Sequence, residues 1–143
     1  MEYYRRNQQI AVRVDAGEEL ISAIRTICEK EHITSAFVQG IGFSDELKVR
    51  VYKKSEDKFY FKTFQESMEL TDISGNIFVA ENGIYPHLHV TGADEEMNIR
   101  GGHLISCLIG ATAELLITIA DFDITRAMCD DLHLGLMRFG GNA

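Results

Sequence analysis

The spacing of hydrophobic and polar positions along the chain predicts one main helix among several strands. Residues 10–14 alternate between apolar and more polar side chains, a pattern typical of a half-buried strand. Within residues 20–28, apolar side chains recur every three or four positions, which predicts an amphipathic helix of about four turns ending near His32. Asp15 and Glu18 precede it with the spacing of a capping box, so we expect them to satisfy the unpaired N–H groups at its start.

After this helix the apolar spacing changes to two, which predicts strands. Asn82-Gly83 is a strong signal for a two-residue hairpin, because both positions tolerate positive φ. The segment 126–136 is predicted to be irregular or partly helical. One main amphipathic helix against a mostly antiparallel sheet is an α+β fold. The predicted strands span residues 36–41, 47–51, 59–61, 68–80 with a break at 74–76, 85–91 and 114–121.

The composition indicates one globular domain that spans residues 1–143. Hydrophobic residues make up 45% of the chain and charged residues 25%, and no segment reads as a linker, a repeat or low-complexity sequence. The formal net charge of −8 arises from 22 acidic residues against 14 scattered basic ones. Since DNA-binding proteins neutralise phosphates with clustered Lys and Arg, we do not expect this chain alone to bind DNA.

The termini and the cysteines indicate a cytoplasmic protein. The start, Met-Glu-Tyr-Tyr-Arg-Arg, lacks the apolar core of a signal peptide. The apolar stretch 104–119 is interrupted by polar residues, so we expect no membrane span. Cys28, Cys107 and Cys129 are odd in number and include no Cys-x-x-Cys pair, which is typical of reduced thiols.

The candidate chemistry lies at three histidines. His87 and His89 stand two apart on a predicted strand, so both point to one face while Leu88 and Val90 face the core. His103 follows a Gly-Gly pair that provides a flexible turn. Three neutral imidazoles with an open fourth position are typical of a catalytic site for one zinc ion or another divalent transition metal. The same spacing also fits surface histidines on a polar sheet face, and it does not distinguish the two interpretations.

The other titratable residues have simpler interpretations. His32 is predicted to cap the helix end, where a cation interacts favourably with the dipole, and His133 is predicted to be structural. The run Asp94-Glu95-Glu96 is predicted to be a solvated loop. Glu69 is the candidate catalytic carboxylate, because such a group near a metal can orient a histidine or move a proton. Isolated carboxylates on strands more often face water, which is the alternative for Glu69.

Five short motifs follow one another along the chain, and each is weak by itself. They are Arg13-Val14-Asp15-Ala16-Gly17-Glu18, Ala36-Phe37-Val38-Gln39-Gly40-Ile41-Gly42, Met68-Glu69-Leu70 leading to Ser74-Gly75-Asn76-Ile77, Pro86-His87-Leu88-His89 and Gly101-Gly102-His103-Leu104. In this order they resemble the plants-and-prokaryotes-conserved (PPC) domain, in its prokaryotic single-domain type. The resemblance covers residues 5–140.

This resemblance implies a strongly curved, mostly antiparallel sheet in a chain that associates as a homotrimer. It also implies that His87, His89 and His103 bind a metal ion. Plant relatives join this domain to AT-hooks, which are short Arg-Gly-Arg-Pro segments, and this chain contains none. The label "DNA-binding protein" that the family often carries is therefore not expected to hold for this chain alone.

Two classes of function remain open. The chain is either a metal-dependent enzyme whose open metal position activates water or binds a small polar substrate, or a trimeric binding or regulatory module with a structural or sensory metal. In the second class it could join a DNA-bound complex through a partner. A cupin-like metalloenzyme is a further alternative, because acidic residues follow the His-x-His pair, although the later Pro-x-Gly and His-x-x-x-Asn parts of that pattern are absent.

Overall fold

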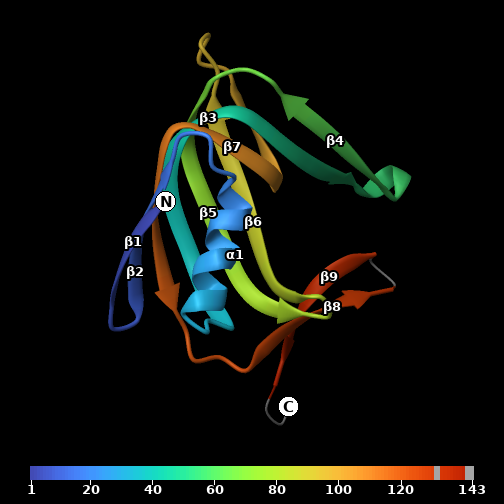
Figure 1. Cartoon of the computed structure of the whole chain (residues 1–143). Coiled ribbons are helices and arrows are strands. Elements are labelled where there is room, and N and C mark those ends of the chain that lie inside the picture. Colours follow the sequence, from blue (N-terminus) through green and yellow to red (C-terminus); the bar gives the residue numbers. More distant parts are fainter. Residues whose placement is uncertain (131–132, 141–143) are drawn as a thin grey trace.

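The structure, a computed structural model, describes residues 1–130 and 133–140. Within these residues, one α-helix packs on a single curved sheet of nine strands (Figure 1). The elements are β1 (Glu2–Arg6), β2 (Gln9–Asp15), α1 (Leu20–Lys30), β3 (Ser35–Lys53), the 3-10 helix η1 (Lys54–Glu56), β4 (Lys58–Phe64), β5 (Met68–Ala80), β6 (Gly83–Ala93), β7 (Ile99–Ile119), β8 (Ile124–Cys129) and β9 (Leu134–Phe139).

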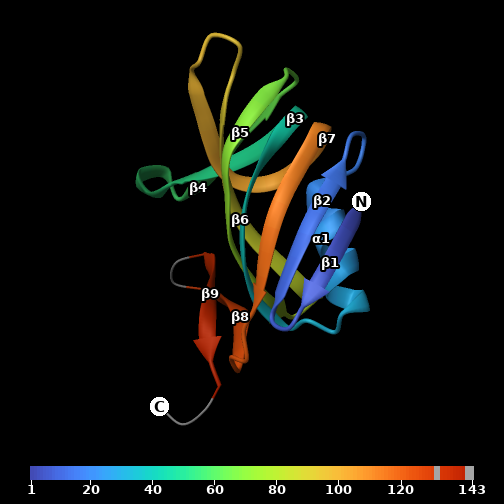
Figure 2. The ribbon, with the colours of Figure 1, turned by 90° about the vertical axis from the view of Figure 1, so that its left-hand side faces the viewer.

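Four strands of the sheet close into a ring. β3 pairs with β5, β5 with β6, β6 with β7, and β7 with β3, all in antiparallel orientation. β7 takes part in both of its ring pairings because residues 99–103 pair with β6 and residues 103–119 pair with β3. β2 extends the sheet beyond β7 and β1 extends it beyond β2, so that both lie near α1 on one side of Figure 2. β5 and β8 pair in parallel, which makes the sheet mixed.

The core lies between α1 and the ring of strands. The helix packs against β6 and β7 with its apolar stripe, in which Ile24 and Ile27 have no exposed area. From β6, Leu88 and Val90 are buried in the same core. Burying each such side chain stabilises the fold by about 1.5–3 kcal/mol. This packing holds β6 in a single orientation, and the residues that alternate with Leu88 and Val90 must then point away from the core.

The helix begins later than the capping-box prediction places it. Its N-cap is Glu19, whose carboxylate accepts hydrogen bonds from the N–H groups two and three residues ahead. Glu18 does reach back to the N–H of Asp15, at 2.8 Å, as predicted. That bond closes a turn before the helix instead of capping it, because Gly17 between them has φ +82°, a left-handed conformation that no helix contains.

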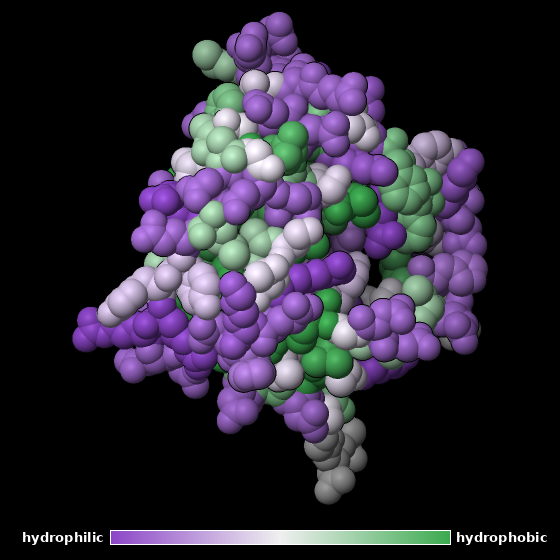
Figure 3. All heavy atoms as spheres, viewed as in Figure 1, coloured by the Kyte–Doolittle hydropathy of each residue, from purple (hydrophilic) through white to green (hydrophobic). Residues whose placement is uncertain are grey.

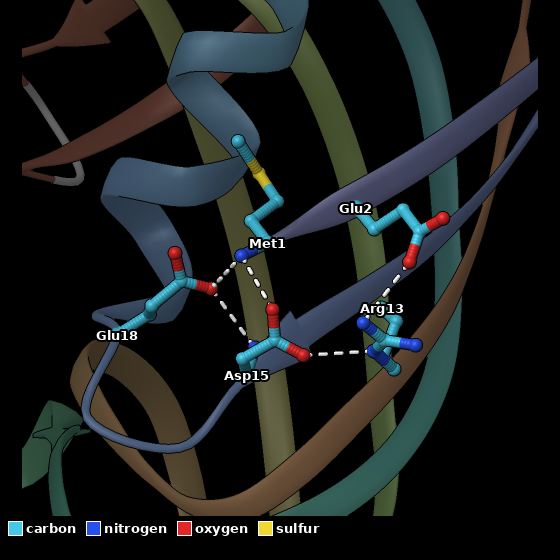
Figure 4. Close-up of polar contacts among 5 residues, drawn as sticks. All are labelled: Met1, Glu2, Arg13, Asp15 and Glu18. Atoms are coloured by element: carbon cyan, nitrogen blue, oxygen red, sulfur yellow. Dashed lines mark hydrogen bonds and ion pairs between the residues drawn. The ribbon is translucent and has the colours of Figure 1, made fainter.

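Asp15 and Glu18 also hold the N-terminal ammonium group (Figure 4). The nitrogen of Met1 lies 2.7 Å from Oδ2 of Asp15 and 2.6 Å from Oε2 of Glu18. Arg13 donates a hydrogen bond to Asp15 and forms an ion pair with Glu2. The hydrogen bond with the ammonium group is the main reason why the pKa of each carboxyl group is lowered. These contacts fasten the start of β1 to the end of β2.

Two hairpins extend from the ring toward the right of Figure 1, one formed by β3 with β4 and the other by β8 with β9. The segment 126–136 was predicted to be irregular or partly helical, and the second hairpin shows that this prediction is wrong for the strands β8 and β9. Residues 131–132 of this segment lie outside the described residues. Both strands are short, and β8 is ordered by pairing with the end of β5, a contact that the local pattern does not reveal. Asp57 beside η1 contacts Nδ1 of His133 at 3.1 Å, which joins the tips of the two hairpins.

The fold is mostly β with one helix, so the α+β prediction fits only loosely. The curved and mostly antiparallel sheet is confirmed, but β3 and β7 are much longer than the strands predicted from alternation. β5 and β6 form the predicted hairpin, although Glu81 and Asn82 make the turn. Gly83, with φ +99°, instead begins β6.

No helix in the described part of the chain is long and apolar enough to cross a membrane. All three cysteines are free thiols, as predicted. Burial raises the pKa of Cys28 and of Cys107 to about 12, so both thiols remain protonated and unreactive near neutral pH.

Candidate metal centre

The three histidines lie on two adjacent strands. His87 and His89 are on β6, and His103 on β7 lies directly opposite His89 in the antiparallel register. Leu88 and Val90 are buried in the core, so the histidines occupy the other face of the strand. The same-face pair predicted from alternation is therefore present, and the strand register brings His103 to it.

The three imidazoles form one compact group. One ring nitrogen from each residue lies within 4.8 Å of the others. The ring centroids of His87 and His103 are 4.8 Å apart. The ring centroid of His89 lies 5.4 Å from that of His87 and 5.5 Å from that of His103. Zinc–nitrogen bonds measure about 2.0–2.1 Å, so modest ring rotations suffice to bring all three nitrogens onto one ion. Among the described residues, no Cys, Asp or Glu joins this group.

The environment favours the neutral form of two of the histidines. Burial, followed by the positive charge of Arg126, lowers the pKa of His87 to about 4. Burial, followed by the charge of Arg50, lowers the pKa of His103 to about 3. A neutral imidazole offers the lone pair that a metal ion needs, whereas an imidazolium has none. The lone pairs of His87 and His103 are therefore available throughout the physiological pH range.

Tyr85 extends the histidine face by one more position along β6. Its ring stacks on that of His87, with centroids 6.1 Å apart and planes inclined by 23°. Its hydroxyl oxygen lies 3.5 Å from Nε2 of His103. The sequence analysis did not identify Tyr85, although its spacing of two from His87 is a signal that could have found it.

Arg50 approaches the group from β3. It lies directly opposite His103 in the register of β3 and β7, so the two side chains share one face of the sheet. Its guanidinium carbon lies 4.5 Å from the centroid of the Phe59 ring, in a cation–π arrangement. Since β3 is distant in the sequence, no local motif indicates this contact.

Arg126 approaches the group from β8. Its two terminal nitrogens donate to Oδ1 of Asn76 at 3.0 Å and to the carbonyl oxygen of Gly135 at 2.7 Å. Asn76 in turn lies opposite His87 in the register of β5 and β6. The sequence analysis did not identify Arg126, because it assigned this segment no strand and no contact with the ring.

Glu69 does not lie with the histidines. Glu69 pairs with Ala93, whereas the β5 residue opposite His89 is Ser74. Ser74 lies several positions further along β5, and each residue of a strand extends the chain by about 3.3 Å. Glu69 and Glu114 instead line a separate cavity of about 590 Å³. The geometry therefore gives no support to the catalytic role that the sequence analysis considered for Glu69.

The loop between β6 and β7 is organised by Asp94, which the sequence analysis assigned to a solvated run. Asp94 is instead buried, and its Oδ1 accepts hydrogen bonds from the N–H groups of Glu96 and Asn98. Glu95 and Glu96 are exposed, as predicted. By closing this loop, Asp94 fixes the register in which His89 meets the strand that follows.

His32 and His133 lie outside the group of three, and the structural roles predicted for them stay predictions. His32 follows the C-cap of α1, and its N–H donates to the carbonyl oxygen of Glu29. His133 contacts Asp57, as described above.

Comparisons with solved structures show the same fold in bacterial and archaeal proteins. A candidate DNA-binding protein from Bacteroides thetaiotaomicron is 28% identical, with a TM-score of 0.91 over 96% of this chain and 96% of that chain. A plant- and prokaryote-conserved protein from Pyrococcus horikoshii is 28% identical, with a TM-score of 0.83 over 96% of this chain and 93% of that chain. A metal-containing protein from Archaeoglobus fulgidus is 23% identical, with a TM-score of 0.83 over 94% of this chain and 95% of that chain.

No curated protein matches the chain. The family model of the Plants and Prokaryotes Conserved (PCC) domain matches residues 1–121, which include all three histidines of the group. This agrees with the family resemblance found in the five sequence motifs. The chain belongs to the Plants and Prokaryotes Conserved domain family.

Proposed function

We propose that the chain is a metal-binding protein in which His87, His89 and His103 hold one divalent transition metal ion, with zinc as the expected metal. The observation that carries the proposal is the approach of three imidazole nitrogens to within 4.8 Å of one another. The lowered pKa of His87 and of His103 adds support, because both rings are ready to coordinate without losing a proton. A solved structure of the same fold, from Archaeoglobus fulgidus, is described as metal-containing.

The proposed role of the site is to act on, or to sense, a small polar ligand at the open metal position. Three protein ligands leave a coordination position free, as in catalytic zinc sites. When bound, the ion would act as a Lewis acid toward an oxygen atom at that position. His89, the exposed member of the group, lies where such a ligand can enter from solvent. Tyr85 would hold the ring of His103 in place through its hydroxyl group.

Elemental analysis of the purified protein tests the metal site. We expect close to one metal ion per chain, and a sharp loss of metal in the double variant His87→Ala, His89→Ala. The matched control is His32→Asn, which removes an imidazole outside the group and keeps a residue that tolerates φ +54°. Circular dichroism checks that each variant is folded. Equal metal content in the double variant and the control would contradict the proposal.

A crystal structure of the metal-loaded protein would separate an enzyme from a sensory or structural module. A water molecule or a small molecule at the fourth position would favour the first class. A fourth protein ligand would favour a structural metal, because structural zinc sites are closed.

We further propose that the chain associates as a homotrimer, with the metal site close to a subunit interface. Several large apolar side chains are exposed, including Phe61 at 58% and Phe139 at 72% of their surface. Phe64, by contrast, is partly buried against the core of its own chain. A closed cyclic assembly would bury the exposed side chains and the free sheet edges. Light scattering coupled to size exclusion would contradict this if it gave the monomer mass of 16.1 kDa at micromolar concentration.

A DNA-associated regulatory module is the second candidate function. It is favoured by the description of the Bacteroides thetaiotaomicron protein, which is 28% identical. The net charge of −8 opposes it, since DNA is itself a dense polyanion. We therefore expect weak or no binding of an A·T-rich duplex by this chain alone near physiological salt. Sub-micromolar affinity in a gel shift would instead support the second candidate.

A further inference from the structure

Arg50 and Arg126 differ from the other arginines in how their charge is balanced. Both are half-buried, and neither forms an ion pair with a carboxylate that the structure describes. The remaining arginines are either paired with carboxylates or exposed to water. Those in ion pairs are Arg5, Arg13 and Arg100, and those exposed to water are Arg6, Arg25 and Arg138.

Each of the two guanidinium groups also has an enclosed donor without an acceptor. Nε of Arg50 and Nε of Arg126 are both shielded from solvent, and neither has a hydrogen-bond partner among the described residues. Leaving a buried N–H group without an acceptor destabilises the protein, and the cost is larger for a charged group. An acceptor supplied by a ligand would remove this cost.

The positions of the two side chains are fixed by other contacts. Arg126 is held by Asn76 and by the carbonyl oxygen of Gly135, and Arg50 lies against the ring of Phe59. In the space-filling view of Figure 3, the right side of the molecule is hollowed between the two hairpins. One hairpin begins in the strand of Arg50, and the other contains Arg126. The arginines thus flank the histidines beside a surface depression.

The charges at this site do not balance, although the chain as a whole is strongly acidic. No carboxylate of a described residue joins the histidine group. A divalent metal ion on three neutral histidines would add two positive charges beside the two guanidinium groups. A negatively charged ligand is the partner that such an arrangement attracts most strongly, since it neutralises charge and accepts charge-assisted hydrogen bonds.

We propose that this site selects small oxyanions, that is, molecules with a carboxylate or phosphate group whose oxygens bind Arg50 and Arg126 while another oxygen faces the metal. The inference rests on the proposed function and specifies its substrate class. The planar guanidinium group suits both kinds of oxyanion, because its parallel N–H donors match two oxygens of either group. Neutral polar molecules of the same size would leave the arginine charges unbalanced.

Calorimetric titration of the metal-loaded full chain tests this proposal with three probes: lactate, inorganic phosphate and lactamide. Lactamide has the size of lactate but no charge. We expect lactate or phosphate to bind, and lactamide to bind at least about 10-fold more weakly. Tighter binding of lactate assigns the ligand to carboxylates, and tighter binding of phosphate assigns it to phosphates.

Arginine variants connect the binding to the two side chains. Arg50→Gln and Arg126→Gln should each weaken binding of the anion about 10- to 100-fold, which is the loss expected for a charge-assisted hydrogen bond. Arg138→Gln is the matched control, because it removes the same charge from β9 at a position opposite Thr125, on the other face of the hairpin from Arg126. The side chain of Arg50 makes no hydrogen bond with a described residue, so its variant should fold normally even if loss of Arg126 disturbs β8.

Metal analysis of the same samples separates this inference from the proposed function. If the wild-type protein contains its metal but binds lactamide as tightly as both anions, or binds neither anion, selection of oxyanions is wrong and the metal site stands. Unchanged anion affinity in Arg50→Gln would likewise overturn the inference. If the protein lacks metal, the proposed function fails, and anion titration of the same metal-free chain shows whether the arginines act alone.

Discussion

The hydroxyl oxygen of Tyr85 lies 3.5 Å from Nε2 of His103, although the two residues belong to different strands. Partners of this kind orient a metal-binding imidazole, and their loss typically lowers metal affinity by about 10- to 100-fold. We therefore expect Tyr85→Phe to weaken zinc binding about 10-fold without unfolding the protein. Competition with a chromophoric chelator measures the affinity. Tyr4→Phe, which changes a largely exposed tyrosine, is the control, and equal affinities in the two variants would contradict the prediction.

The stability of the metal-free protein should fall as pH decreases from about 6.5. The pKa of His87 is lowered to about 4 and that of His103 to about 3, so the unfolded chain, with ordinary values near 6.5, binds more protons between these limits. Stability therefore rises with pH in this window and becomes independent of these two groups above it. Carboxyl groups with lowered pKa, such as that of Glu18, act in the same direction only below about pH 4.5.

Urea unfolding between pH 7 and pH 5 isolates the histidine contribution, because the carboxyl groups remain ionised there. We expect the slope of stability against pH to become smaller in the double variant His87→Gln, His103→Gln. A stability that does not change between pH 7 and pH 5 in the unmodified chain would contradict the assignment.

Gly75 is predicted to be essential for the position of His87. A methyl group at Gly75 would lie 2.0 Å from the carbonyl oxygen of His87 and 2.9 Å from Cα of Leu88. Gly75→Ala must therefore push β5 and β6 apart, and we expect a loss of about 3 kcal/mol in the free energy of unfolding together with weaker metal binding. In the control Gly135→Ala, the nearest atoms lie 3.8 Å away, and the change should stay within about 0.5 kcal/mol. Similar stability of the two variants would refute the steric argument.

Acetylation of the Met1 amino group should destabilise the fold at neutral pH. The amino group is held by Asp15 and Glu18, which raise its pKa, so the ion pairs are present below its ordinary value near 8.0 and are lost as pH rises through the raised value. They are also lost at acidic pH, once both carboxyl groups take up protons. Thermal unfolding of the free and acetylated chains should therefore differ most near neutral pH and at low salt. A difference that persists unchanged at high pH would argue against the ion pairs.

Period-two alternation was enough to predict that His87 and His89 share a face, because neighbouring residues of a strand must point in opposite directions. The distance from His103 to this pair depends on the register of β6 and β7, which the loop around Asp94 sets. The sequence suggested His103 as the third ligand because it follows Gly101-Gly102, but the flexible turn predicted there is wrong. Both glycines lie within β7 and pair with β6. Strand register, which brings His103 to the pair, is not visible in the spacing of residues.

The two arginines show where local reasoning ends. Arg50 reaches the histidines because β3 pairs with β7, and Arg126 reaches them because β8 pairs with the end of β5. Both pairings join distant parts of the chain, and no local period predicts them. Glu69 shows the opposite case, since it is on a predicted strand beside β6 but at a position too far along it.

The three histidines belong to one hairpin, whereas the two arginines come from strands outside it. A hairpin forms within microseconds because its contacts are local, while pairing of distant strands closes long loops and is slow. During folding, the β6–β7 hairpin can thus assemble its three imidazoles before the ring of strands closes. A metal ion captured at this stage would act as a template that accelerates the later steps. The proposed selection of oxyanions by Arg50 and Arg126 would develop last, when β3 and the hairpin of β8 and β9 pack against the histidine strands.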